Sequence, residues 1–118
     1  MPSRFVANWR TQARKGVLEL AVLNALGGGR MYGYEIVKAL QRVPGLVIVE
    51  GTVYPIMSRL AKEGLVDSSL EASPEGPARK YYRLSTDGIA ALASINSAWD
   101  EISSGISALR RVDGRADG

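Results

Sequence analysis

The chain has 118 residues, a length that suits one hydrophobic core and one domain. It contains no cysteine and no histidine. This composition excludes disulfides, iron–sulfur clusters and thiol nucleophiles, and it removes the commonest general base and zinc ligand. No phosphate-binding loop of the G-x-x-x-x-G-K-[ST] type is present. We therefore expect no enzymatic activity, no metal and no cofactor, and the net charge of +3 points only weakly to an anionic partner.

The chain begins with a basic segment, but no apolar stretch of signal-peptide length follows it. The apolar run at residues 16–26 contains Glu19 and Asn24 and is too short to span a bilayer. We expect a cytoplasmic protein, close to the nucleoid if it binds DNA, with no membrane contact.

The first predicted helix carries Phe5, Trp9 and Ala13 at a spacing of four, the spacing of one helical face. Val17 and Leu20 extend this stripe, and other apolar residues fill a second one, so the helix is expected to be buried from two sides. The glycines at 27–29 end it. The arm at residues 1–14 has no assigned role.

A shorter helix is predicted next, from the apolar spacing of Ile36, Val37 and Leu40. Pro44-Gly45 stops it, and the β-branched run at residues 46–49 predicts a short strand.

The third predicted helix has the clearest limits. Thr52 is the expected N-cap, Pro55 falls in the first turn, and Gly64 follows the C-cap. One face is apolar, which leaves the polar side chains on the other face exposed. The inward set is Val53, Ile56, Met57 and Leu60, and the outward set is Tyr54, Ser58, Arg59 and Lys62.

A hairpin is predicted from strands at residues 66–71 and 79–85, joined by an irregular segment rich in proline and glycine at residues 72–78. Alternation in the second strand places Lys80, Tyr82 and Leu84 on one face. Arg79, Tyr81 and Arg83 then lie on the other face. Arg79 and Lys80 are expected at the foot of the hairpin, where a phosphate backbone would pass.

The last helix is expected to start near Ser85 or Thr86 and to carry a heptad seam over about two and a half heptads. A seam of large apolar side chains is costly to leave in water, because burying each one is worth roughly 1.5–3 kcal/mol. We therefore predict a homodimer built on the first and last helices. The interface residues are Trp9, Val17, Leu20, Leu92, Ile95, Trp99, Ile102, Ile106 and Leu109.

The predicted fold is mainly α with a small β-hairpin, a winged helix-turn-helix domain with N- and C-terminal dimerisation helices. The whole of 1–118 forms one unit, with the winged core at 15–85, the dimerisation helix at 86–111 and a frayed tail at 112–118. Such a unit binds double-stranded DNA by placing its third helix in the major groove.

Four segments of this chain resemble the PadR-type transcriptional regulators, in the family's order and over about residues 15–90. They are GVLELAVLNAL, YGYEIVKAL, EGTVYPIMSRLAKEGLV and GPARKYYRLSTDG. The final helix, with Trp99 on its seam, resembles that of the short subfamily. The resemblance implies a homodimeric winged helix-turn-helix repressor. The two-fold symmetry of such a dimer predicts a pseudo-palindromic operator.

The resemblance also implies DNA contacts around the G-T-x-Y-P and R-K-x-Y segments, and it places the second tyrosine of Y-G-Y-E near the DNA backbone. The matching residues are Gly51, Thr52, Tyr54 and Pro55, then Arg79, Lys80 and Tyr82, and finally Tyr34. Some family members bind flat aromatic compounds between two tryptophans at the dimer interface. Trp99 stands at the matching place, and with Ile95 and Ser103 it forms the expected effector site.

Alternative interpretations remain open for these features. Arg59 and Lys62 also fit a solvated helix face, Tyr34 and Tyr54 also fit half-buried packing, and Trp99 also fits a plain dimer core. For Tyr82 we expect a place in the core rather than a DNA contact, because its strand face also carries Leu84. The rival functions are a protein-interaction adaptor that keeps the winged helix without binding DNA, an enzyme, and a single-strand or RNA binder. The adaptor is the main alternative, because residues 51–83 carry five basic against four acidic side chains.

Overall fold

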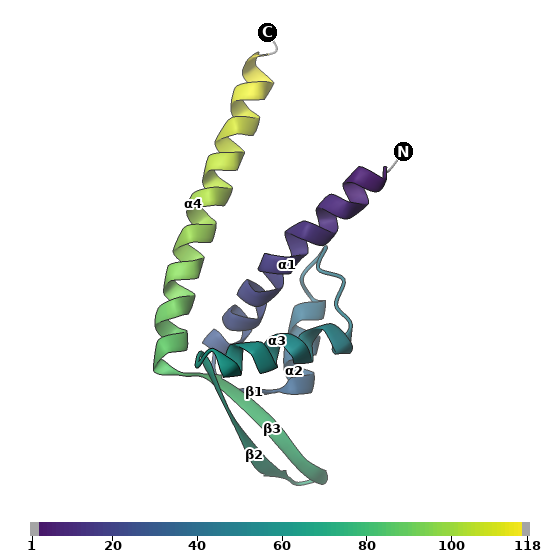
Figure 1. The fold of residues 1–118 in the computed structure, drawn as a ribbon, viewed down its shortest axis with the longest axis vertical. Helices are drawn as coiled ribbons and strands as arrows, with labels where there is room; N and C mark the ends of the chain where they lie inside the picture. Colours follow the sequence, from purple (N-terminus) through teal and green to yellow (C-terminus); the bar gives the residue numbers. More distant parts are fainter. Residues whose placement is uncertain (1–2, 117–118) are drawn as a thin grey trace.

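The computed structural model describes residues 3–116, which form four helices and a three-stranded antiparallel sheet. The elements in chain order are α1 (Arg4–Gly27), β1 (Met31–Tyr32), α2 (Gly33–Gln41), α3 (Glu50–Lys62), β2 (Val66–Ser73), β3 (Gly76–Leu84) and α4 (Thr86–Ala116). This confirms the predicted fold class. Helices α1 and α4 project from one side of the winged core as two rods, which makes the molecule long, 63 × 34 × 22 Å (Figure 1).

The hydrophobic core lies where the C-terminal half of α1 meets α2, α3 and the sheet. Its buried side chains are Val22, Leu23, Leu26, Ile36, Val37, Leu40, Val53, Met57, Leu60, Val66 and Tyr82. The predicted inward face of α3 is confirmed, with Ile56 half-buried at its margin. No helix among residues 3–116 is long and apolar enough to cross a membrane.

Helix α3 starts earlier than predicted. Its N-cap is Val49, which makes no side-chain capping bond, and its first residue is Glu50, so Thr52 is not the cap. Pro55 consequently lies in the second turn, where its missing N–H leaves the Gly51 carbonyl without its usual helical partner. No side-chain cap fixes the start of α3. The helix begins where the extended backbone of the preceding loop ends, at Val49.

The predicted strand at residues 46–49 is wrong, because this segment is a loop. Leu46 is buried, whereas Val47 is exposed and adopts a φ of 52°, which costs energy for a β-branched residue. Neither strand ladder of the sheet includes this segment.

The sheet has one more strand than the predicted hairpin, in the order β1-β3-β2. Strand β1 is only two residues long, too short for any alternating pattern to reveal it. The hairpin strands are also longer than predicted, because Ser73 pairs with Gly76 and little of the 72–78 segment stays irregular. Pro77 lies within β3, at a position beyond the reach of β1, where a missing N–H is tolerated.

Helix α4 begins at Thr86, as predicted, and runs to Ala116, five residues past the predicted boundary at 111. The predicted frayed tail is therefore helical over 112–116, and its last two residues, 117–118, lie outside the described part. Arg110 and Arg111 favour the helix, and an established helix propagates at little cost.

The start of α4 is locked onto the end of α3. The Ser85 hydroxyl donates to the Gly64 carbonyl at 2.6 Å and accepts from the Gly88 N–H at 3.0 Å. The Ser85 N–H donates to the Leu65 carbonyl at 3.0 Å. Gly64 has a φ of 79°, as expected for the residue that ends α3. A Cβ on Gly88 would lie 2.0 Å from the Leu65 carbonyl oxygen, so only glycine allows this contact.

We predict that Gly88→Ala destabilises the protein by about 1–3 kcal/mol, the usual cost of overpacking, because the Leu65 backbone must move. Gly105→Ala is the matched control, since no atom lies within 4 Å of its added Cβ, and helix propensity should make it stabilising by about 0.5–1 kcal/mol. Urea unfolding of both variants measures the difference. Equal effects of the two substitutions would contradict the close packing at Gly88.

Candidate nucleic-acid interface

A hollow of about 200 Å³ opens where the N-terminus of α2, the start of α3 and the free edge of β3 meet. We call it the tyrosine hollow. Its lining residues are Tyr32, Gly33, Tyr34, Tyr54, Arg79, Lys80 and Tyr82. Four of the predicted DNA contacts, Tyr34, Tyr54, Arg79 and Lys80, thus come together from three separate elements.

The basic groups around the tyrosine hollow lie over tyrosine rings. The Arg79 guanidinium carbon lies 4.4 Å from the centre of the Tyr32 ring, and the Lys80 Nζ lies 5.7 Å from that of Tyr82. On α2, the Lys38 Nζ lies 5.6 Å from the centre of the Tyr34 ring. Among the described residues, none of these three cations forms an ion pair. A ring face attracts a cation without neutralising it, so the three charges remain available to an anion.

The outward face of α3 continues this surface. Gly51, Pro55, Ser58 and Lys62 are all exposed along it, and Thr52 is half-buried. Hydroxyl and ammonium groups of this kind bind phosphates and base edges. The exposed polar face predicted for α3 is therefore present, and no other described segment covers it.

Tyr54 is held at the flank of α3 that faces the tyrosine hollow. A Cβ on Gly33 would lie 2.7 Å from Cε1 and 2.8 Å from the hydroxyl oxygen of Tyr54. Only the absence of a side chain at Gly33 therefore lets the ring pack this closely against the start of α2. Tyr54 is still 38% exposed, so it lies at the surface and is not part of the core.

Arg59 occupies the opposite flank of α3, about 140° around the helix from Tyr54 at 3.6 residues per turn. It forms an ion pair with Glu19 of α1. The structure therefore does not bring Arg59 to the tyrosine hollow, although Arg59 and the residues of the hollow were predicted as parts of one DNA-binding surface.

Tyr82 forms the floor of the hollow. Burial raises the pKa of its phenol above the ordinary value of 10.0, and the neighbouring Tyr54 adds to the effect. The phenol is therefore uncharged at neutral pH, and Tyr82 supports the hollow as a packed, neutral ring, in agreement with its predicted place in the core.

A second feature is a groove of about 350 Å³ between the rods α1 and α4. It is lined by Gln12, Ala13, Gly16, Val17, Leu20, Ile95, Ala98, Trp99 and Ile102. Two of the three predicted effector residues, Ile95 and Trp99, are on its wall. Ser103 is not, and its hydroxyl donates to the Trp99 carbonyl at 2.8 Å. The back-bond satisfies the hydroxyl within α4.

Most of the predicted dimer residues are exposed in the single chain, namely Trp9 on α1 and the seam of α4 from Ile95 to Leu109. Trp9 is 61% and Trp99 is 44% exposed, and Ile102, Ile106 and Leu109 are more exposed than Trp99. Leu20 is buried, and Val17 and Leu92 are half-buried between the rods. Nearer the core, the amides of Asn24 and Asn96 exchange two hydrogen bonds of 2.9 Å, which fix α1 against α4.

Three residues of this surface were not singled out from the sequence. Tyr32 lies in β1, whose two residues carry no periodic signal, and Gly33 is the first residue of α2. Lys38 is recognisable only once Tyr34 is placed one turn before it on the same side of α2. The spacing of four between these two residues was the available signal.

The chain matches the model of the "Transcriptional regulator PadR-like family" over residues 22–94. The chain belongs to this family. It is therefore a transcriptional regulator that binds DNA, and the family match bears out the resemblance seen in the sequence.

Solved structures of PadR-like proteins agree. A PadR-like transcriptional regulator from Bacillus cereus is 35% identical, covers 83% of this chain and 95% of its own, and gives a TM-score of 0.76. A PadR family regulator from Eggerthella lenta is 32% identical, covers 89% and 91%, and gives 0.75. A Streptococcus transcriptional regulator is 35% identical, covers 84% and 97%, and gives 0.76.

We predict that Gly33→Ala weakens DNA binding by this PadR-like protein about tenfold, with little loss of stability. The added Cβ meets only the far end of the Tyr54 side chain, which swings away and leaves the hollow misshapen. Fluorescence anisotropy with duplex DNA and a thermal melt measure the two effects. Gly28→Ala, where the Cβ meets open space, is the control. Unchanged DNA affinity in Gly33→Ala would show that the position of Tyr54 is irrelevant to binding.

Proposed function

We propose that the protein is a homodimeric repressor that covers a promoter, with α3 in the major groove and the tyrosine hollow against the adjacent DNA backbone. The observation that supports this most strongly is the set of three cations, Lys38, Arg79 and Lys80, which lie over tyrosine rings and have no carboxylate partner within the described part of the chain. Phosphate contacts from such groups fix the register of a protein on DNA. Its place of action is then the cytoplasm, at the nucleoid.

The proposed contact surface divides into two parts. The tyrosine hollow would bind the DNA backbone, and the exposed polar face of α3 would read base edges. The contacts are Tyr34, Arg79 and Lys80 for the first part, and Gly51, Thr52, Tyr54, Pro55, Ser58, Arg59 and Lys62 for the second. Residues 15–85 then serve as the DNA-binding core and residues 86–111 as the dimerisation helix.

Arg59 can join this surface only by leaving Glu19. The pair is solvated, with 62% of the Arg59 side chain exposed, and solvated ion pairs contribute only about 0–1 kcal/mol. Exchanging Glu19 for a phosphate or a guanine edge therefore costs Arg59 little free energy. Arg59 would bind DNA by exchange, whereas Arg79 and Lys80 have no anionic partner among residues 3–116 to give up.

Duplex DNA from upstream of the protein's own gene tests this function by fluorescence anisotropy. We expect Lys80→Ala to weaken binding about tenfold and to lower the slope of log affinity against log salt by about one, as loss of one phosphate contact requires. Arg83→Ala removes the same charge from the same strand outside the hollow and should have little effect.

Three outcomes would contradict this function. Equal effects of Lys80→Ala and Arg83→Ala would show that only net charge matters. Unchanged affinity in both Lys80→Ala and Arg59→Ala at physiological salt would remove the winged-helix DNA-binding mode, and absence of any binding to the duplex would favour the adaptor.

The homodimer rests on the apolar stripes of the two rods. Phe5 is 76% exposed at the start of α1, and the seam of α4 is exposed from Ile95 to Leu109. A two-fold partner would cover both stripes at once. It would also present two copies of α3, which could read half-sites about 34 Å apart.

We expect Ile102→Glu to convert the dimer to a monomer, because a carboxylate in the seam would be buried without a partner. Sedimentation equilibrium measures the mass, and circular dichroism checks that the helices remain. Ser104→Glu places the same charge on α4 outside the seam and should leave the dimer intact. A wild-type protein that is monomeric at micromolar concentration would contradict this assembly.

We also propose a flat aromatic effector between Trp99 and its symmetry mate. The α1–α4 groove, with Ile95 and Trp99 on its wall, supports this. Such a ligand releases DNA only if it binds better to the arrangement of the two wings that does not fit the operator.

Trp9→Phe leaves Trp99 as the sole tryptophan, and its fluorescence should be quenched in a saturable manner by a planar aromatic compound. The reciprocal variant Trp99→Phe reports on Trp9 and should show no such quenching. Absence of quenching across a broad panel would leave Trp99 as plain dimer core.

A further inference from the structure

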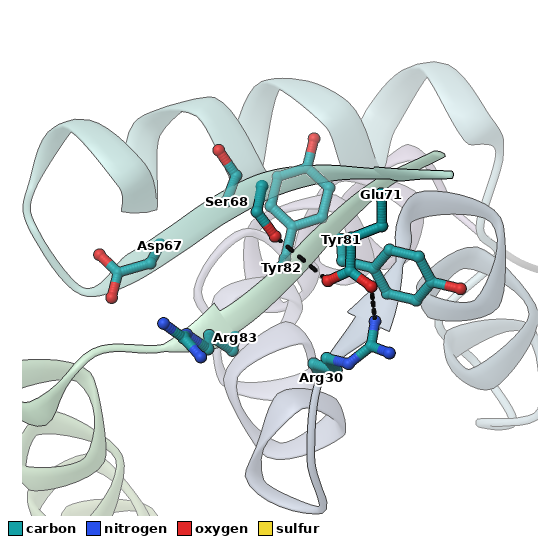
Figure 2. A pocket seen from close by; sticks show the side chains of 8 residues that line it. Arg30, Asp67, Ser68, Glu71, Tyr81, Tyr82 and Arg83 are labelled. Carbon is teal, nitrogen blue, oxygen red and sulfur yellow. Dashed lines mark hydrogen bonds and ion pairs between the residues drawn. The ribbon is translucent and has the colours of Figure 1, made fainter. Parts of the chain in front are cut away.

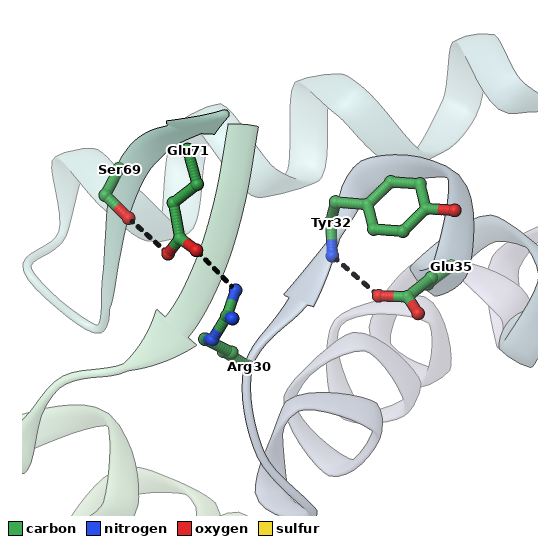
Figure 3. Close-up of polar contacts among 5 residues, drawn as sticks. All are labelled: Arg30, Tyr32, Glu35, Ser69 and Glu71. Atoms are coloured by element: carbon green, nitrogen blue, oxygen red, sulfur yellow. Dashed lines mark hydrogen bonds and ion pairs between the residues drawn. The ribbon is translucent and has the colours of Figure 1, made fainter. Parts of the chain in front are cut away.

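Arg79 has a carboxylate neighbour that it does not use. In the register of β2 and β3, Glu71 lies directly opposite Arg79, so both side chains extend from the same face of the sheet. Opposite charges at such positions normally pair. Here the Glu71 carboxylate is instead bound by Arg30, at 3.0 Å, and accepts from the Ser69 hydroxyl at 3.3 Å (Figure 3).

Arg30 is held in this place by an aromatic ring. Its guanidinium carbon lies 4.1 Å from the centre of the Tyr81 ring, and Figure 2 shows the guanidinium below this ring and joined to the Glu71 carboxylate. The Tyr81 ring meets the Tyr32 ring edge-on, with centres 5.5 Å apart and planes at 68°. Glu71, Arg30, Tyr81, Tyr32 and Arg79 therefore form one continuous network across the sheet.

The position of the Tyr32 ring depends on its backbone. Tyr32 pairs with Tyr81 through the β1–β3 ladder, and its N–H donates to the Glu35 carboxylate at 3.0 Å (Figure 3). Substitutions of the ring therefore leave these backbone contacts in place.

We propose that Tyr32 is a positioning residue that holds Arg79 for a DNA phosphate, and that Arg30 keeps Glu71 from neutralising Arg79. This rests on the proposed function. The Tyr32 face restricts the guanidinium before DNA arrives, so less side-chain entropy is lost on binding. It also leaves the full positive charge, whereas a Glu71 pair would have to be broken for each phosphate contact.

A double-mutant cycle tests the Tyr32 step. DNA affinity is measured over a salt series for wild type, Tyr32→Leu, Arg79→Ala and the double variant, with the duplex from upstream of the protein's own gene. Tyr32→Leu should weaken binding about three- to tenfold. In the Arg79→Ala background it should have no further effect, and Tyr32→Phe, which keeps the ring face, should retain wild-type affinity.

Phenylalanine analogues with one, two and three ring fluorines at position 32 separate the ring face from its shape. Fluorine withdraws electrons from the face and preserves packing, so DNA affinity should fall stepwise while the melting temperature stays constant. Equal affinity across the series would overturn the proposal, and this test holds even where Tyr32→Leu fails to fold.

The role of Arg30 is tested by rescue. Arg30→Gln frees Glu71 to pair with Arg79 and should weaken DNA binding severalfold. Adding Glu71→Gln removes the competing carboxylate and should restore the affinity of the wild type. A loss in Arg30→Gln that Glu71→Gln does not rescue would overturn this part of the proposal.

The remaining outcomes separate this inference from the proposed function. Additive losses for Tyr32→Leu and Arg79→Ala would overturn the positioning role while DNA binding through the hollow stands. An Arg79→Ala variant with normal affinity, alongside a weakened Lys80→Ala, would overturn it in the same way. A wild-type protein that binds no duplex would overturn both.

Discussion

The interface depends on how its positive charges are held. Lys38, Arg79 and Lys80 lie over tyrosine faces, and among the described residues they have no carboxylate partner. An aromatic face orients a cation and keeps it charged, whereas a carboxylate orients it and cancels the charge. This difference allows a surface with nearly balanced local charge to present a positive site.

The fold provides this arrangement by stopping one strand early. Strand β1 ends at Tyr32, so β3 has a free edge beyond that point, where Arg79 and Lys80 project next to the first turn of α2. Gly33 then admits the Tyr54 ring from α3. At the far end of the sheet, the Gly88 contact ties α4 to the end of α3, so the rods and the winged core are joined through a close-packed backbone contact.

Much of this architecture was predictable because its signals are local. The apolar spacing of α3 and the glycine at position 64 predicted that helix and its C-terminal end, and Ser85 predicted the start of α4. Two of the features that were not predicted depend on contacts between distant segments. Strand β1 exists only because β3 pairs with it, and Arg59 meets Glu19 from 40 residues away. No pattern within a short window carries such contacts.

A crystal structure of the dimer with an operator duplex would test the central claim most directly. We expect the Arg79 guanidinium and the Lys80 ammonium within about 3 Å of phosphate oxygens, the usual length of a charge-assisted hydrogen bond, with Arg79 still over the Tyr32 ring. A complex in which the tyrosine hollow faces solvent, or in which Arg79 has turned to Glu71, would contradict the account.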